Sequence, residues 1–272
     1  IEVKFSDGSM IKCNKEHLWT VYDRTTRVFR TVTTEYLMGR VLLSGKDKPR
    51  SIFQVQRLEP LKFEYKDLPI HLYFIGVWLG VGTSTNPYIT HDKDDCEHIN
   101  YIEQIGYPVR KVFIHKDTGA HTSSFTKLNI KQDLRELNLY DNKHIPDIYK
   151  YSSIEQRLQL LAGFIDTDGH VDKKNFRVRL CNSNKKLIDD LFELVSSLGL
   201  YPYISKIDGD GRQFMETKYT VNKTHYQIGF NPLIDIPTKI PRKKIKSTTL
   251  ILLLIRSRSL NFCRTRNHQK NG

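Results

Sequence analysis

The chain has 272 residues, of which 39% are hydrophobic and 27% are charged, the balance of an ordinary globular protein. Its longest aliphatic run, "LILLLI" at 250–255, is much shorter than the ~20 residues of a membrane-spanning helix, and no export signal opens the chain. Four cysteines lie far apart without a CxxC pair, which argues against a zinc knuckle or a redox motif. We therefore expect an intracellular protein from a reducing compartment that is not secreted.

The net charge of +13 suggests a polyanionic partner, but this charge is unevenly distributed. Ten Lys or Arg and no acidic residue lie between 236 and 272, whereas the first 235 residues have a surplus of only three positive charges. Nucleic-acid binding must therefore be argued from a local surface and not from the total.

Residues 1–56 have the alternating pattern of β structure. "IEVKFSDGSMIKCN" alternates on both sides of Asp7-Gly8, a hairpin turn signal, and "LWTVYDRTTRVFRTV" repeats the pattern around "DRTT". The stretch "EPLKFEYKDLP" that follows, closed by Pro69, is typical of a linker. We therefore expect a small β segment followed by a connection of irregular structure.

After Pro69 the period changes to that of helices. "IHLYFIGVWLG" at 70–80 and "SIEQRLQLLAGFID" at 153–166 predict two helices, and Ser153 with Gln156 forms a capping box at the start of the second. Each helix leads into a glycine turn, a polar extended stretch, another helix and further strands. Those next helices are expected at 93–107 and 183–200.

The order of these elements predicts an internal repeat of 87 residues, the distance from Val81 to Asp168. "NKHIP" at 142–146 and "TKIP" at 238–241 also place a lysine before an Ile-Pro pair in each copy. The alternative is two unrelated α+β segments, but the ordered agreement of helix, turn glycine and lysine favours the repeat.

Small residues four apart lie on one face of each predicted helix, where they let two backbones approach closely. In the repeat alignment, Gly76 matches Gly163 and Gly80 matches Thr167. We therefore expect these four residues to form a helix–helix interface, with the C-terminal ends of both helices side by side.

Val81 and Asp168 would then meet at those ends, each next to a glycine. A helix C-terminus carries partial negative charge, so a carboxylate there favours a bound divalent cation. Two acids, one from each helix, would suit Mg²⁺, and such a cation can activate water and stabilise a leaving phosphate oxygen. Val81 stands where the second acid would be.

"LAGFIDTDG" at 161–169 resembles the signature of the LAGLIDADG homing endonucleases, with seven of nine letters matching. "IGVWLGVGTS" at 75–84 is similar to the first signature of intein-borne, DOD-type members, which usually reads "LGxWLGDGTS". The resemblance covers roughly residues 70–243. It implies an α+β fold of two pseudo-symmetric αββαββα halves, with saddle-shaped sheets over DNA.

The same resemblance implies site-specific double-strand cleavage with Mg²⁺ or Mn²⁺. The implied partner is a long asymmetric double-stranded DNA site in the intein-less host gene, bound by a monomer with internal pseudo-twofold symmetry. The implied location is the cytoplasm or nucleoid of a microbial or viral host.

Carried over by position, Asp168 resembles a metal-binding acid and Val81 occupies the degenerate position of the other acid. Lys143 resembles the active-site lysine of the first half, and Lys239 is its counterpart by the internal repeat. Without the repeat, each lysine would be interpreted as a solvated surface charge. Since Val81 removes one acid, we expect impaired cleavage. The alternative is a non-cleaving DNA- or RNA-binding protein on the same fold, either a decayed endonuclease or a maturase-like protein.

DNA contacts would come from the strands of the saddle. "KKNFRVRL" alternates, which places Asn175, Arg177 and Arg179 on one face, where arginine can read guanine in the major groove. A solvated strand face would have the same pattern. The other candidates are Tyr88, Arg110, Lys111 and His115 in the first half, and Tyr201, Tyr203 and Lys206 in the second half.

"CNKEHLWTVYDR" is similar to the intein block with a TxxH motif, in which His17 matches the histidine and Asn14 replaces the threonine. The alternative is a β-domain histidine without a catalytic role. The chain begins at Ile1 and ends "NHQKNG", without the terminal residues that splicing needs, so we expect that it does not splice by itself.

The expected organisation is a partial Hint (intein splicing) segment at 1–56, a linker at 57–69, a first half at 70–151, a second half at 152–243 and a basic tail at 244–272. The tail has no acid and an abrupt aliphatic run. Either a frameshift near residue 245 or decay of a splicing segment would explain it, and the alternative is a basic arm for the DNA backbone.

Overall fold

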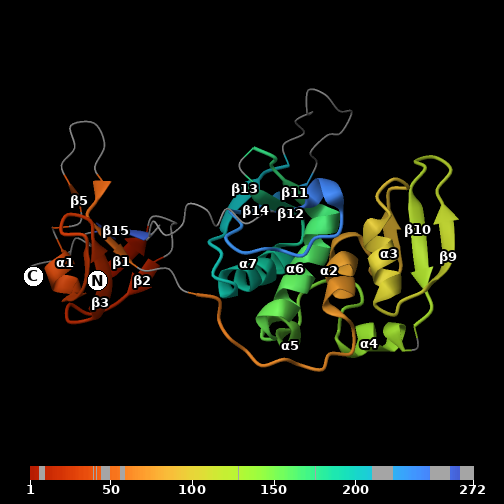
Figure 1. Cartoon of the computed structure of the whole chain (residues 1–272), viewed down its shortest axis with the longest axis horizontal. Helices are drawn as coiled ribbons and strands as arrows, with labels where there is room; N and C mark the ends of the chain where they lie inside the picture. Colours follow the sequence, from red (N-terminus) through yellow and green to blue (C-terminus); the bar gives the residue numbers. More distant parts are fainter. Residues whose placement is uncertain are drawn as a thin grey trace, which may run out of the picture. The chain divides into compact units, whose positions relative to one another are not determined.

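The computed structural model describes residues 1–5, 10–38, 40, 42–43, 50–55, 59–127, 129–174, 176–209, 223–245 and 258–263. The chain divides into two compact units, the first formed by 1–58 with 250–272 and the second by 59–249 (Figure 1). Among the described helices, none has the length and apolar character needed to cross a bilayer.

The first unit is built around a six-stranded sheet in the order β2-β1-β15-β7-β3-β4. Its strands are β1 (Glu2–Phe5), β2 (Met10–Lys12), β3 (Leu18–Asp23), β4 (Val28–Thr33), β7 (Phe53–Val55) and β15 (Arg258–Cys263). A short helix, α1 (Thr34–Leu37), and a strand pair, β5 (Leu42–Leu43) with β6 (Arg50–Ser51), complete it. Val3, Trp19 and Val21 contribute to its small apolar core.

Strand β15 comes from the basic tail and lies between β1 and β7 in this sheet, antiparallel to both. Residue Val3 pairs with Phe262, and Val55 pairs with Arg258. This segment of the tail is thus part of a sheet formed mainly by residues near the N-terminus.

The predicted hairpin around "DRTT" is confirmed, because β3 and β4 pair antiparallel from Asp23–Val28 outward. A carboxylate oxygen of Asp23 accepts hydrogen bonds from the backbone of Thr25 and Thr26, which fixes the turn. The predicted turn at Asp7-Gly8 lies outside the described residues, and the strands on either side of it pair antiparallel.

The second unit is centred on two helices, α2 (Leu72–Val81) and α6 (Ile154–Asp168), which lie side by side (Figure 1). A Cβ added to Gly76 would be 2.1 Å from the carbonyl oxygen of Leu160, and one added to Gly163 would be 2.3 Å from that of Tyr73. Both helices thus touch backbone to backbone where only glycine fits. The predicted capping box at the start of α6 is confirmed.

Each helix leads into a mixed arrangement of strands and helices, which confirms the predicted α+β class. The first sheet has the order β8-β10-β9 and the second β11-β12-β14-β13. The strands are β8 (Ile89–His91), β9 (Val109–Ile114), β10 (His121–Phe125), β11 (Gly169–Val171), β12 (Val178–Asn182), β13 (Tyr203–Ile207) and β14 (His225–Phe230). The helices are α3 (Glu97–Gln104), α4 (Ile130–Glu136), α5 (Asp147–Lys150), α7 (Lys185–Ser197) and the 3-10 turn η1 (Pro241–Lys243).

The segment predicted as a linker is tied to the second unit from residue 59 onward. The buried guanidinium of Arg157 donates to the carbonyl oxygens of Leu61 and Ser197. The side-chain amide of Gln156 donates to the carbonyl oxygen of Lys66 and accepts the backbone N–H of the same residue. Because a buried charge needs such partners, α6 and this segment hold each other in place.

Candidate nucleic-acid interface and catalytic centre

The C-terminal ends of α2 and α6 are adjacent. A Cβ added to Gly80 would be 2.2 Å from Oγ1 of Thr167 and 3.5 Å from Cγ of Asp168. Val81 is the last residue of α2, partly buried against the apolar core. The structure therefore brings together the two positions that the repeat alignment pairs, one carrying an acid and the other a valine.

The carboxylate of Asp168 lies in a largely desolvated place. Burial raises its pKa above the ordinary value, and the nearby Lys143 ammonium and a hydrogen bond from Asn182 lower it. The Asn182 amide donates to Oδ2 of Asp168 over 3.3 Å. A cation at this point would favour the charged carboxylate.

Lys143 closes the C-terminal end of α2. Its Nζ donates to the carbonyl oxygens of Leu79, at 3.1 Å, and Gly82, at 2.7 Å. Burial lowers the pKa of Lys143 to about 8, although the charge of Asp168 opposes this. The ammonium thus neutralises the negative end of the helix dipole next to Val81.

Lys243 does the same at the end of α6, and sequence reasoning missed it. Its Nζ donates to the carbonyl oxygens of Ile165, Asp166 and Thr167, at 3.1, 2.7 and 2.8 Å. Burial lowers the pKa of Lys243 to about 8. A signal was present in "PRKK", which continues the basic run just beyond the second Ile-Pro pair.

Lys239, the residue predicted for this role, lies elsewhere. Its Nζ is 3.9 Å from the ring centroid of Tyr101, and its backbone N–H donates to Asp166 over 2.7 Å. Lys143 precedes its Ile-Pro pair, whereas Lys243 follows the second pair. An alignment of the two pairs therefore selects Lys239 instead of Lys243.

Asp166, the other acid of "FIDTDG", is a buried support. It accepts hydrogen bonds from the Tyr73 hydroxyl, at 2.6 Å, and from the backbone of Lys239 and Ile240, at 2.7 and 3.2 Å. Burial raises its pKa, and these donors oppose the increase. Asp166 therefore fixes the segment that leads to Lys243.

The second sheet has a polar face whose members follow from its register. Arg179 and Tyr203 both pair with Gly229, and the Tyr203 ring lies over that glycine. Arg177 lies 5.9 Å from the centroid of the same ring. These aromatic and cationic side chains therefore share one face, as direct contact with a nucleic acid would require.

The other residues predicted to contact DNA in this half do not lie together on that face. Lys206 lies three residues after Tyr203 along β13 and is therefore on the opposite face, where it forms an ion pair with Asp208 at 2.6 Å. Tyr201 is partly buried just before the strand, and Asn175 lies outside the described residues. The register adds Gln227 and Ser205, which pair with each other on the face of Tyr203. The alternation in "HYQIGF" could have predicted Gln227.

In the first sheet, Lys111, Phe113 and His115 alternate along and just beyond β9. The Lys111 ammonium lies 4.7 Å from the Phe113 ring centroid, and the Tyr88 ring lies 6.2 Å from that of Phe113. These residues therefore form one exposed cluster. Arg110 lies at a bulge, since Ser124 pairs with Lys111 and the next residue of β10 pairs with Val109.

In the first unit, Asn14 and His17 are both exposed. The His17 ring packs edge-on against Trp19, with centroids 4.7 Å apart, and its carbonyl oxygen accepts the backbone N–H of Thr34. The structure thus positions His17 at the start of β3 through neighbours of its own unit.

A cleft of about 540 Å³ opens beside Val81. Thr167, His91, His98 and Arg242 are among its lining residues. Within the described part of the chain, no group of three or more His, Cys, Asp or Glu side chains is arranged to hold a metal ion.

Residues 155–265 match the sequence profile of the LAGLIDADG-like domain. The chain is also 32% identical over 216 residues to a replicative DNA helicase DnaB of Mycobacterium intracellulare, covering 73% of this chain and 34% of the helicase. A probable translation initiation factor IF-2 of Thermococcus kodakarensis is 23% identical over 141 residues, covering 50% of this chain and 12% of that protein. The chain thus spans about a third or less of these relatives.

Among solved structures, the homing endonuclease I-DmoI in complex with DNA and Ca is similar, with a TM-score of 0.39 and 14% identity. The match covers 59% of this chain and 82% of that chain. The complex of I-DmoI with DNA and Mn gives a TM-score of 0.38 with 13% identity, over 59% and 88%.

Proposed function

We propose that this chain is an intein-derived LAGLIDADG homing endonuclease of the DOD type whose cleavage is impaired. The observation that carries the proposal is the meeting of α2 and α6 at their C-terminal ends, with Asp168 and two lysines there and a valine at position 81. The chain would bind double-stranded DNA as a monomer, through the polar strand faces that flank this point.

The metal proposed is Mg²⁺ or Mn²⁺, held by Asp168. Magnesium is commonly bound by one or two carboxylates together with phosphate oxygens and water, so a single aspartate and a DNA phosphate fit it. A bound divalent cation would supply charge stabilisation at the scissile phosphate. With Val81 in place of the second acid, the donor set is half of what the resemblance implies.

Lys143 and Lys243 would contribute positive charge on either side of this centre. Each ammonium already neutralises the carbonyl oxygens at the end of one helix, so each is held in a fixed place. A preorganised cation stabilises negative charge that develops on a phosphate without reorganisation during the reaction.

The intein origin is supported by the two relatives, whose names describe unrelated proteins. The matched regions make up 34% of a helicase and 12% of a translation factor, as expected for a segment inserted into different hosts. The first unit would be the splicing part, with His17 as the remnant of its catalytic histidine. The profile match runs to residue 265, beyond the point considered for a frameshift, and so favours an unshifted tail.

The alternative function is a non-cleaving DNA- or RNA-binding protein on the same fold. One observation favours it: the last residue of α2 is Val81, whose apolar side chain packs against the core and offers no oxygen to a cation. Both functions require nucleic-acid binding through the strand faces, and they differ in cleavage and in the form of nucleic acid preferred.

Binding measurements test the shared part of the proposal. We expect Arg179→Ala and Tyr203→Ala to weaken binding to selected double-stranded DNA by about 1–3 kcal/mol each. Lys206→Ala, on the opposite face of the same sheet, is the matched control and should leave affinity unchanged. Genomic fragments that include the uninterrupted gene of a replicative DNA helicase are a suitable library. Equal losses in all three variants, or preference for RNA, would contradict the endonuclease assignment.

A further inference from the structure

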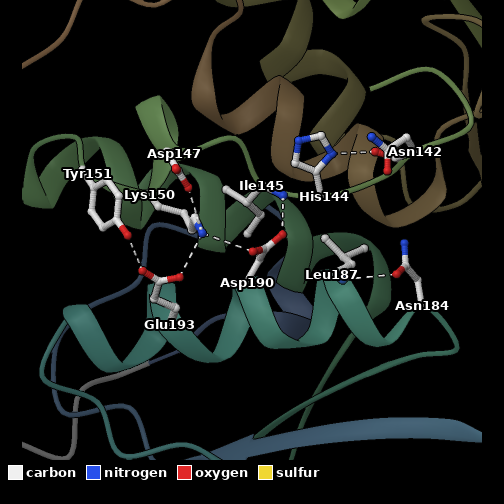
Figure 2. Close-up of polar contacts among 10 residues, drawn as sticks. All are labelled: Asn142, His144, Ile145, Asp147, Lys150, Tyr151, Asn184, Leu187, Asp190 and Glu193. Carbon is white, nitrogen blue, oxygen red and sulfur yellow. Dashed lines mark hydrogen bonds and ion pairs between the residues drawn. The ribbon is translucent and has the colours of Figure 1, made fainter. Parts of the chain in front are cut away.

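The segment 142–146, which carries Lys143, is held by the second half of the chain. The side-chain amide of Asn184 donates to the carbonyl oxygen of Lys143 over 2.7 Å. The carboxylate of Asp190 accepts the backbone N–H of Ile145 over 2.9 Å (Figure 2). Asn184 is the N-cap of α7, and Asp190 lies on that helix.

The oxygen of the Asn184 side chain is also engaged, because it accepts the backbone N–H of Leu187 over 3.2 Å (Figure 2). One amide therefore caps α7 with its oxygen and holds the lysine segment with its nitrogen. This is more than an ordinary helix cap requires.

An ion network also binds α5, the helix that directly follows this segment, to α7. The buried Lys150 ammonium lies 3.2 Å from Asp190, 2.9 Å from Glu193 and 3.0 Å from Asp147 (Figure 2). Because Asp190 takes part in both this network and the bond to Ile145, it connects them.

On the other side, the residue before the second lysine is bound in the reverse direction, while the carbonyl oxygen of Lys243 itself accepts the hydroxyl of Thr238 over 3.1 Å. Arg242, the neighbour of Lys243, donates through Nε to Asp95 over 3.0 Å and through a second N–H to the other carboxylate oxygen. Asp95 belongs to the first half and directly precedes Cys96, the N-cap of α3. Such two-point arginine–carboxylate pairs are stronger and more directional than neutral hydrogen bonds.

Residues at the N-terminal ends of α3 and α7 thus each bind the lysine-bearing segment of the opposite half. We propose that Asn184 and Asp95 are positioning residues, Asn184 for Lys143 and Asp95 for Lys243. A lysine side chain has many conformers, and anchoring its own backbone, as Asn184 does, or the residue beside it, as Asp95 does, restricts where the ammonium can lie. The proposal rests on the proposed function for the catalytic purpose of the two lysines.

The crossed pattern can be tested by NMR of the lysine side-chain ammonium groups, assigned with Lys143→Met and Lys243→Met. Asn184→Asp keeps an oxygen to cap α7 and removes the amide donor. We expect the ammonium protons of Lys143 to exchange with water about tenfold faster, the change expected from losing one hydrogen bond, and those of Lys243 to be unchanged. Asp95→Asn should have the opposite pattern.

Asn142→Asp is the matched control. Asn142 lies in the same segment as Lys143, and its side-chain amide donates to the carbonyl oxygen of Asn138. It should leave both lysines unchanged. If Asn184→Asp unfolds α7, as seen by circular dichroism, Asn184→Ser retains a capping oxygen and replaces it.

The proposal is overturned if either substitution leaves its own lysine unchanged, or if both lysines respond to each substitution. The ammonium signals report lysine position whether or not DNA is cut. Loss of the crossed pattern is therefore separate from a failure of the proposed endonuclease activity, which is measured by cleavage.

Discussion

The ammonium of Lys143 lies 2.7 Å from the carbonyl oxygen of Gly82, the residue directly after Val81. The hydrogen bond joins two segments separated by 61 residues and places a positive charge beside the end of α2. With Lys243 at the end of α6, each helix C-terminus is closed by one lysine. Under the proposed function, the two ammonium groups would stabilise the negative charge of a phosphate at these helix ends.

The pKa of Lys143 gives a first prediction. Because the folded protein holds this pKa near 8 and the unfolded chain near 10.5, the unfolded state binds more protons between these values. The free energy of unfolding should therefore rise with pH across this window, by about 3 kcal/mol relative to Lys143→Met. Urea denaturation of both proteins from neutral to alkaline pH measures the difference, since Lys243 is present in both. A constant difference would contradict the buried position of Lys143.

The packing of α2 on α6 gives a second prediction. Gly76→Ala would place a Cβ 2.1 Å from the carbonyl oxygen of Leu160, so the helices must separate. We expect a loss of about 3 kcal/mol or more in the free energy of unfolding. Gly119→Ala is the control, because a Cβ added there meets no atom within 4 Å. The cost of this substitution comes from the left-handed backbone alone, with φ of 71°. Its cost should be about 1–2 kcal/mol, and equal costs in the two variants would contradict the close approach.

The central helices could be predicted from the sequence because local rules decide them. The capping box of Ser153 and the apolar period of α6 need no distant partner, and both are confirmed. Lys243 could not be chosen over Lys239, because its position depends on carbonyl oxygens 76 to 78 residues away. The strand faces show another limit: the spacing of three already puts Lys206 on the face opposite Tyr203, whereas the pairing of Tyr203 with Gly229 depends on the register.

The tail gives a third prediction. Because β15 lies between β1 and β7, a chain ending at Thr249 would leave two strand edges without their partner. We expect faster amide hydrogen exchange in β1 and β7 and an earlier melting transition of the first unit. Exchange in α2 and α6 serves as the internal control and should not change. Unaltered exchange in β1 would show that the tail strand is not part of this sheet in solution.

Metal binding gives a fourth prediction. Val81→Asp would place a second carboxylate near Asp168, and two like charges at close range disfavour each other. We expect this variant to be less stable than the parent without metal and to gain more stability from Mg²⁺, because a ligand that binds only the folded state stabilises it. Val81→Asn has the same shape without the charge and should gain no more than the parent. Equal Mg²⁺ effects in all three proteins would argue against a shared cation at the helix ends.

Under the proposed function, the residue at position 81 decides whether both DNA strands are cut. The most direct measurement incubates the parent, Val81→Asp and Val81→Asn with Mg²⁺ and the selected DNA site, and follows nicked and linear products. We predict double-strand cleavage by Val81→Asp only, with at most nicking by the other two. Efficient double-strand cleavage by the unaltered protein would contradict it.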